Sequence, residues 1–270
     1  MRRWTHDVSA DWLMERKAVL TATEVAGLLT EYKRYLKKAP GTLMPGAAAL
    51  WAAKRADGEV DTSSPSPAAA RGHIMEPWAV RSWNAQVDKE LYHWDDCIIC
   101  RTDLAVNVGF SPDAMDIMQL YPEARLDVSA DGKFLVNKEG MACDAPTEVM
   151  EIKSYDVPKH SKCCIMDKME HDELMQLAMP FVVLPHLKRA RLLWFCPDAP
   201  WSMHTESYTG DDLHDQVKWI MEILEWYEGQ AALCEAMPDR LLKAQCTEEE
   251  VWNAFVAEQA SDSDDVFMLK

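Results

Sequence analysis

The stretch "TEVMEIKSYDVPKH", residues 147–160, places an acid two residues before a lysine. Residues 147–152 are predicted to form a strand, because Val149 and Met150 are apolar. Side chains alternate between the two faces of a strand, so Glu151 and Lys153 point the same way. An isolated pair of this kind is more often a surface ion pair. A chemical role therefore requires further residues nearby.

A second acid with suitable placement lies upstream, in "GFSPDAMDI", residues 109–117. Ser-Pro-Asp is typical of a turn, and the apolar residues that follow predict a strand that starts at or near Asp113. If this strand neighbours Glu151, two carboxylates come together, and they repel unless a divalent cation joins them. A nearby lysine would orient or deprotonate a water, or stabilise charge on a phosphate. The pattern predicts metal-assisted phosphodiester hydrolysis.

The helices and strands that must position these residues are predicted from the periodicity of apolar residues and from capping and turn residues. Ser9 is predicted to cap a helix, and Thr21 and Glu24 have the spacing of a capping box. Helices are predicted over 9–20, 21–38, 71–86, 169–183 and 211–236, and a last helix is capped by Thr247 and Glu250. Most of residues 90–155, "RARLLWFCPD" and "SMHTESY" have strand character. This order predicts an α/β domain with a central mixed β-sheet flanked by helices.

Composition limits the alternatives. The 270 residues are 48% hydrophobic and 27% charged, as expected of a globular protein, and the formal net charge is −17. An acidic body argues against a polyanion ligand, unless a groove is locally basic or metal ions neutralise its carboxylates. No Gly-rich phosphate loop and no G-x-S-x-G motif occur. Cys97 and Cys100 lie in an apolar context, so no zinc or iron–sulfur site is expected.

Localisation is expected to be cytoplasmic, in a bacterial or phage-infected host cell. The N-terminal "MRRWTHDV" has no apolar region behind its arginines, and no apolar run is long enough to span a membrane.

Five stretches together resemble a known family. In chain order they are "RKAVLTATEVAGLL", "RGHIMEPWA", "DLAVNVGFSPDAM", "EVMEIKSY" and "HDELMQLAMPFVVL". Each motif alone is weak, but their order is that of the lambda exonuclease and YqaJ-type viral recombinase family of PD-(D/E)xK nucleases, which the chain resembles over residues 9–200. The resemblance implies a restriction-endonuclease-like core. It also implies one nuclease domain over 1–260, with an acidic tail over 261–270 that is expected to be disordered.

The chain departs from the family pattern in several places. Thr23 stands where the family has Ser, and Ala114 replaces a Gly. Pro77 follows Glu76, and a residue before proline is disfavoured in helical geometry. The sequence therefore also predicts, as an alternative to one helix over 71–86, that a helix begins at Pro77 and leaves Glu76 outside it. The separation of Asp113 from Glu151 is far longer than a hairpin needs, so residues 118–146 are interpreted as an inserted β excursion.

The resemblance implies a metal site built from Asp113, Glu151 and the Ile152 carbonyl. Mg²⁺ is the expected ion, with Mn²⁺ as a substitute. Asp103 would serve a second metal or its water shell, or would be an ordinary acid at a strand end. Both readings remain open from the sequence.

Three further residues receive catalytic roles by resemblance. Lys153 would act on the attacking water or the scissile phosphate. Glu76 would hold a metal-bound water, and Gln176 would orient active-site groups from the following helix. Their alternatives are a surface lysine, an exposed acid and a surface glutamine.

Arg16 and Thr23 are predicted to form a separate phosphate site. Thr23 lies in the first turn of a helix, where free N–H groups and the helix dipole favour an anion, and Arg16 would add a bidentate clamp. The alternative is that Thr21 and Thr23 only cap the helix. The resemblance implies that the ligand is a terminal 5′-phosphate of DNA.

The function implied is a Mg²⁺-dependent 5′-to-3′ exonuclease of phage-type recombination. It would act on double-stranded DNA ends and leave 3′ overhangs for a single-strand annealing protein. The resemblance also implies a homo-oligomer, a trimer. The alternatives are an endonuclease or repair nuclease on the same core, and a non-catalytic protein that binds DNA or a partner.

Overall fold

The computed structural model describes residues 9–55, 67–87, 89–119, 123–166 and 171–236. The chain divides into two compact units, one formed by Met1–Ala26 with Glu59–Glu222 and the other by Gly27–Gly58 with Ile223–Lys270. The single-domain boundary at residue 260 stays a prediction. The helix capped by Thr247 and the tail over 261–270 lie outside the described residues.

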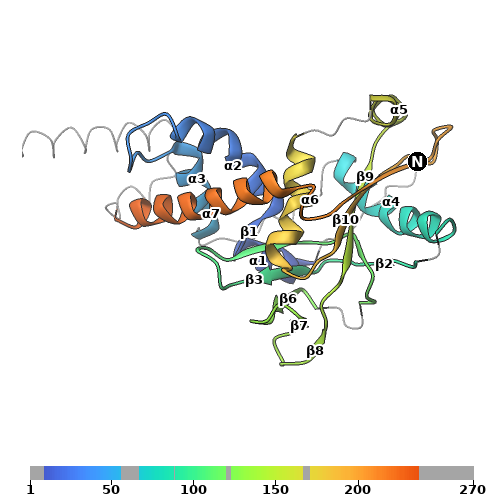
Figure 1. The fold of residues 1–270 in the computed structure, drawn as a ribbon, viewed down its shortest axis with the longest axis horizontal. Helices are drawn as coiled ribbons and strands as arrows, with labels where there is room; N and C mark the ends of the chain where they lie inside the picture. The colour runs from blue at the N-terminus through green and yellow to red at the C-terminus, as the bar shows by residue number, and fades with distance from the viewer. Residues whose placement is uncertain (1–8, 56–66, 88, 120–122, 167–170, 237–270) are drawn as a thin grey trace, which may run out of the picture. The chain divides into compact units, whose positions relative to one another are not determined.

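The first unit contains a five-stranded mixed sheet in the order β11-β10-β9-β5-β2. Its central strand is β9 (Glu148–Ser154), which runs parallel to β10 (Arg189–Phe195) and antiparallel to β5 (Ala114–Met115). The outer strands are β11 (Met203–Tyr208) and β2 (Tyr92–His93). The predicted strand around Glu151 is therefore hydrogen-bonded on both sides (Figure 1).

A second, six-stranded sheet of the same unit has the order β1-β4-β3-β6-β7-β8. Its strands are β1 (Leu20–Thr21), β4 (Val108–Phe110), β3 (Ile98–Arg101), β6 (Arg125–Val128), β7 (Phe134–Val136) and β8 (Ala142–Asp144). The chain passes from β4 of this sheet to β5 of the other through Ser111, Pro112 and Asp113. Pro112 has no N–H group to continue a ladder, which suits it to this crossing.

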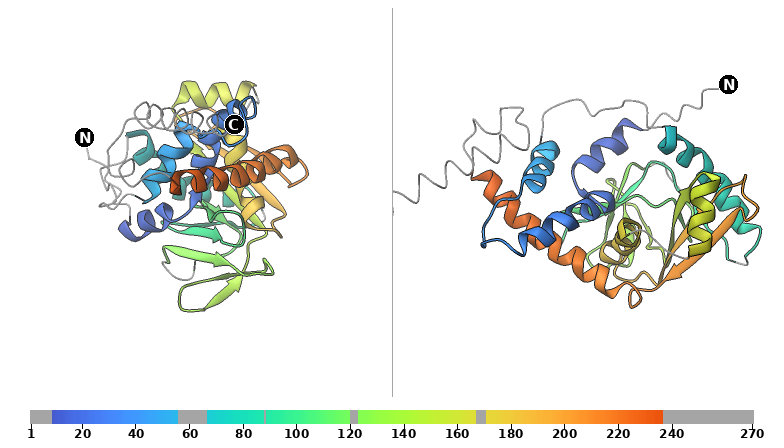
Figure 2. Two further views of the ribbon diagram at one scale, coloured as in Figure 1. Left: turned by 90° about the vertical axis from the view of Figure 1, so that its left-hand side faces the viewer. Right: turned by 90° about the horizontal axis from the view of Figure 1, so that it is seen from above.

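The predicted β excursion over 118–146 supplies β6, β7 and β8. β6 pairs parallel with β3, and the other two strands follow as antiparallel neighbours at the edge of the sheet (Figure 2). The turn "SADGKF", residues 129–134, joins β6 to β7, with Gly132 at φ +74° and its N–H donating to the Ser129 carbonyl.

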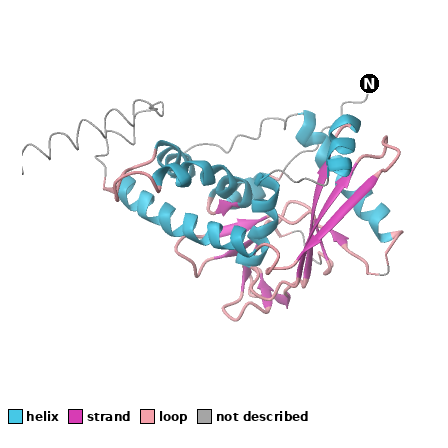
Figure 3. Ribbon diagram, turned by 45° about the horizontal axis from the view of Figure 1, so that its top comes forward, coloured by secondary structure: helices cyan, strands magenta, loops and turns pink. Residues whose placement is uncertain are grey.

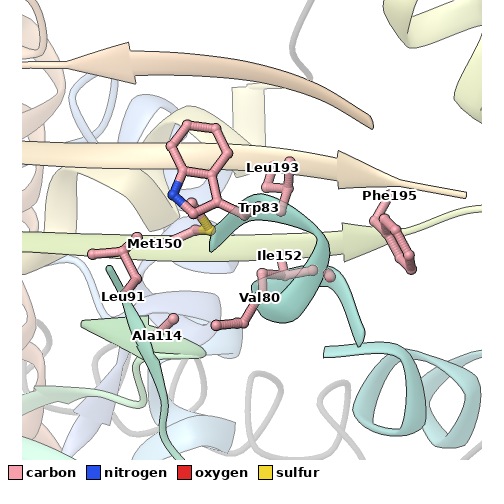
Figure 4. Close-up of a cluster of buried hydrophobic side chains, with 9 residues drawn as sticks. Val80, Trp83, Leu91, Ala114, Met150, Ile152, Leu193 and Phe195 are labelled. Atoms are coloured by element: carbon pink, nitrogen blue, oxygen red, sulfur yellow. The ribbon is translucent and has the colours of Figure 1, made fainter. Parts of the chain in front are cut away.

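Four helices belong wholly to the first unit. They are α1 (Ala10–Lys17), α4 (Pro67–Asn84), α5 (Val157–Met166) and α6 (His171–Val183). α6 contacts β10 of one sheet and β3 and β4 of the other (Figure 3). α4 packs on β9 and β10, where Val80 and Trp83 meet Met150, Ile152 and Leu193 in a buried cluster (Figure 4). The predicted α/β class, with mixed sheets flanked by helices, is confirmed.

The prediction that a helix begins at Pro77 is wrong. Pro77 lies inside α4, so Glu76 is helical. Proline removes one backbone hydrogen bond from a helix interior. Here Ala79, Val80 and Trp83 follow it on the buried side of the same helix, so tertiary packing holds the helix through the proline.

Other element boundaries also differ from the expectation. α1 ends at Lys17 rather than residue 20, because Leu20 enters β1 and its N–H donates to the Asn107 carbonyl. α5 was not predicted. Ser9 caps α1, and the capping box at the start of α2 (Ala22–Tyr35) forms as predicted, with Glu24 accepting from the Thr21 N–H and hydroxyl.

The second unit holds most of α2, the unpredicted helix α3 (Pro45–Arg55) and the C-terminal part of α7 (His214–Glu235). Tyr32 and Tyr35 of α2 pack against the ring of Trp226. Buried Gln230 accepts a hydrogen bond from the Met44 N–H and donates to the Thr42 carbonyl. Aromatic packing and one satisfied buried amide thus hold these helices together.

Candidate active site

Asp113 and Glu151 meet because of the register between β5 and β9. Ala114 pairs with Met150 and Met115 with Val149, so Asp113, directly before β5, falls beside Glu151. Asp113 Oδ2 accepts a hydrogen bond of 2.6 Å from the Ile152 N–H. This hydrogen bond continues the pairing of β5 with β9 through the Asp113 side chain. It fixes the Asp113 carboxylate next to that of Glu151.

The pKa of Asp113 is raised well above its usual value. Burial is the largest cause, and the nearby carboxylates of Glu151 and Glu76 add to it, while the Ile152 N–H and Lys153 act in the opposite direction. Asp113 thus lies buried beside two further acids. Such a group favours either a proton or a cation.

Lys153 is held between the second carboxylate and α6. Its Nζ donates to Glu151 Oε1 at 2.6 Å and to Gln176 Oε1 at 2.8 Å. Burial lowers the pKa of Lys153, but the neighbouring acids, Glu151 first, together raise it overall. The ammonium is thus oriented from two sides, and one of its two partners is the predicted glutamine.

Glu76 faces Asp113 from α4 and lies between two histidines that the sequence did not single out. Its oxygens lie 3.5 Å from His73 Nδ1 and 3.7 Å from His93 Nε2. Burial raises the pKa of Glu76, but the two imidazoles lower it to about 2. His73 precedes Glu76 by one helical turn, a spacing that could have been noticed. His93 comes from the two-residue strand β2, which has no comparable local signal.

The carboxylate oxygens of Asp113 and Glu151 suit a Mg²⁺ ion, which takes few protein ligands and keeps several waters. Among the described residues, no group of three or more His, Cys, Asp or Glu side chains is arranged as a metal site. Two carboxylates with the Ile152 carbonyl would nevertheless give three oxygens. The pKa of Asp113 is raised by burial first and by Glu151 and Glu76 second, and a cation bound beside this carboxylate would oppose both effects.

Asp103 is not brought to this group. It follows β3, its side chain is 57% exposed, and its carboxylate pairs with Arg101 through bonds of 2.6 and 3.1 Å. Among the described residues, no hydrogen bond or ion pair joins Asp103 to Asp113 or Glu151. These contacts match the alternative of an acid at a strand end.

Arg16 and the start of α2 lie close together. The Arg16 guanidinium stacks on the Trp12 ring at 4.5 Å from its centroid and interacts with Glu24. Burial lowers the pKa of Arg16 and Glu24 opposes this shift. Thr23 is exposed in the first turn of α2. Glu24 already accepts from Thr21 in the capping box, so an incoming phosphate would share this helix start with a carboxylate.

The first residue of β9 is another buried acid, Glu148. It accepts hydrogen bonds from Lys89 Nζ at 3.0 Å and from Arg191 Nε. Asp116 lies beside it and accepts from the Thr147 hydroxyl at 2.6 Å and from the Thr147 N–H at 3.0 Å. Burial raises the pKa of Glu148, but these cations lower it overall. The protein itself neutralises this carboxylate.

The remaining cysteine and membrane predictions concern other parts of the chain. Cys97 and Cys100 are buried at and next to β3, and burial raises the pKa of the Cys100 thiol to about 12. Within the described ranges, none of the helices combines the length and apolar character needed to cross a membrane.

Comparisons with known proteins place the fold. No family model matches the sequence, and neither does any curated protein. The structure is similar to that of LHK-Exo in complex with dAMP, with 17% identity and a TM-score of 0.55 over 83% of this chain and 95% of that one. A second structure of LHK-Exo, an alkaline exonuclease from Laribacter hongkongensis, aligns with 16% identity and a TM-score of 0.49 over 82% and 94% of the two chains. The chain therefore shares the mixed α/β fold of the LHK-Exo–dAMP structure.

Proposed function

We propose that this protein is a Mg²⁺-dependent deoxyribonuclease that degrades one strand of duplex DNA from its 5′ end. It would act as a member of the lambda exonuclease-like group and leave 3′ overhangs for a single-strand annealing protein. A homotrimer is the assembly proposed with this activity. The fold likeness to an exonuclease crystallised with dAMP supports a nucleic-acid substrate.

One observation carries the proposal. Asp113 and Glu151 lie beside each other on paired strands, and Lys153 is held against them by Gln176. A purely structural acid pair at this position would raise the energy of the folded state without benefit. The combination of two neighbouring acids and a fixed ammonium fits a phosphodiester and a divalent ion.

The side chains divide the work as follows. Asp113, Glu151 and the Ile152 carbonyl would hold the ion, which when bound lowers the pKa of water and offsets phosphate charge. Lys153, kept as an ammonium by Glu151, would stabilise charge on the scissile phosphate and orient the attacking water. Gln176 fixes the lysine, and Glu76 would orient a water from the side of α4.

The direct test uses linear duplex DNA labelled at either the 5′ or the 3′ end, with Mg²⁺ or with EDTA. Mononucleotides should appear from the 5′ label first, only with Mg²⁺ or Mn²⁺. A covalently closed circle of the same sequence should stay intact. Cleavage of the circle would support the endonuclease alternative, and DNA binding without any cleavage would support the non-catalytic one.

The 5′-phosphate assignment has its own test. Charge-assisted hydrogen bonds contribute about 1.5–3 kcal/mol each, so 5′-phosphorylated ends should be degraded roughly 10- to 100-fold faster than 5′-hydroxyl ends. Arg16→Gln should remove this preference. Lys17→Gln, one residue further along α1, is the matched control and should keep it. Equal rates on both ends in the parent protein would reject the 5′-phosphate site while leaving the nuclease core untouched.

A further inference from the structure

Four residues gather where β9 ends, beyond the carboxylates. We call Arg71, Tyr155, Lys159 and Glu173 the strand-end cluster. Arg71 Nη2 donates to the Tyr155 carbonyl at 3.1 Å, and Lys159 Nζ lies 4.0 Å from the centroid of the Tyr155 ring. The Tyr155 hydroxyl hydrogen-bonds to the buried carboxylate of Glu173. The cationic side chains of Arg71 and Lys159 thus both contact Tyr155.

The cluster is in line with the candidate active site. Lys153 contacts Gln176, and Tyr155, two residues later, contacts Glu173, which is three residues earlier on α6. The strand-end cluster and the candidate active site therefore lie along the same two segments of the chain. On α4, Arg71 precedes Glu76 by five residues, or about 7.5 Å. From Glu151 to Tyr155 the chain advances about 13 Å. At about 3.4 Å per nucleotide along a DNA strand, this is a span of a few nucleotides.

Charge explains why such a cluster would be needed. The chain carries a formal net charge of −17, and the active site adds three carboxylates around Asp113. A phosphodiester backbone is repelled by this surface wherever no cation opposes it. Arg71 and Lys159 supply two such cations at the strand-end cluster, where Glu173 bonds to the Tyr155 hydroxyl and Asp156 accepts from the Lys159 N–H at the start of α5.

We propose that Arg71 and Lys159 bind backbone phosphates of the DNA strand whose scissile phosphate lies at Asp113 and Glu151. Arg71 is half-buried and fixed by the Tyr155 carbonyl, which suits oriented recognition of phosphate oxygens. Lys159 is exposed and supplies a point charge. The proposal rests on the proposed function and names the groups that hold the substrate away from the reacting phosphate.

Salt dependence of DNA binding is the measurement that isolates these contacts. Binding of a short fluorescent duplex to the full-length protein is followed in EDTA, to prevent cleavage, over a range of salt concentrations. Each lost phosphate contact reduces the slope of log K against log salt by about 0.7–0.9. Arg71→Gln and Lys159→Gln should each reduce it by this amount, and the double variant by about twice as much.

The matched control removes the same two charges elsewhere in the unit. Lys133 and Lys188 are exposed, and Lys133→Gln/Lys188→Gln should leave the slope unchanged. An equal fall in the control would mean a general charge effect and would overturn the proposal, as would an unchanged slope in the exposed, single Lys159→Gln variant. Thermal unfolding of each variant shows whether it is folded.

Hydrolysis of the p-nitrophenyl ester of thymidine 5′-phosphate separates this proposal from the nuclease assignment. This small diester reaches the metal site but not the strand-end cluster, so the double variant should hydrolyse it at the parent rate in Mg²⁺. A hundredfold loss would place Arg71 or Lys159 in the chemistry and contradict the proposal. Absence of hydrolysis in the parent would count against the nuclease function, whereas the salt slopes would still report on the cluster.

Discussion

Two acids of β9, Glu148 at its start and Glu151 at its middle, lie in opposite electrostatic surroundings. Around Glu148 the chain supplies Arg191 and Lys89, and the pKa of this acid is lowered. Only three residues further on, Glu151 adjoins Asp113, whose pKa is raised by burial and by other acids. The strand thus carries one acid whose neighbours are cations and a second acid that has another carboxylate beside it as well as Lys153. The difference separates an acid that is paired with cations of the fold from the acids that we propose as ligands of a metal ion.

The largest expected effect is on catalysis. Asp113→Asn or Glu151→Gln should lower DNA hydrolysis on the order of 10³-fold, because a metal ion supplies several kcal/mol to such a reaction. Glu148→Gln should stay within about tenfold of the parent per folded molecule. If Asp113→Asn and Glu151→Gln both keep substantial activity in a nuclease assay, these carboxylates are not the metal ligands.

For the free energy of unfolding, we expect the larger loss from Glu148→Gln, the variant with the smaller effect on catalysis. Glu148→Gln should lower the free energy of unfolding by roughly 2–4 kcal/mol, because it leaves two cations beside a weaker acceptor. Urea denaturation at neutral pH measures this loss. A change below about 0.5 kcal/mol, the range of ordinary surface substitutions, would show that the ion pairs at this end of β9 contribute little.

Asp113→Asn should instead stabilise the protein by about 1 kcal/mol when Mg²⁺ is chelated, because like charges no longer face each other. Added Mg²⁺ should raise the melting temperature of the parent and not that of the variant, since only the parent has the full ligand set. Melting curves with and without Mg²⁺ test both statements. Parallel responses of the two proteins would argue against a cation at Asp113.

The smallest effect concerns pH. The pKa of Glu148 is lower in the folded state than the unfolded value of about 4.3. Its stabilisation is therefore present above that value and is lost as pH falls through the folded pKa. The stability difference between parent and Glu148→Gln should shrink below about pH 4. A difference that stays constant from neutral pH into this acid range would contradict the assigned ion pairs.

The sequence was most informative where a rule is local. Alternation on a strand predicted that Glu151 and Lys153 share a face, and the turn at 111–113 predicted where β5 would start. The capping box of Thr21 and Glu24 formed as predicted. Local rules failed at Pro77, where packing overrode the tendency of proline to mark a helix boundary. They also failed for two-residue strands such as β2, which have no periodicity to detect.

Long-range partners were beyond these rules. The cations around Glu148 come from positions 43 and 59 residues away in the chain, and Arg71 lies 84 residues from Tyr155. No spacing announces such contacts. His93 reaches Glu76 for the same reason, through pairing of β2 with β5 rather than through any pattern in its own segment.

The hydrogen bonds between Asp116 and Thr147 also bear on how the chain tolerates variation in length. These residues flank the β excursion, and they are joined to each other by side-chain and backbone bonds. The excursion is therefore a closed loop whose two ends already meet beside β5 and β9. Doubling the length of a flexible loop costs only about 0.6 kcal/mol in closure entropy. A peptide grafted at Gly140, where nothing lies within 4 Å of an added Cβ, would consequently change the edge of the six-stranded sheet without shifting Asp113 relative to Glu151.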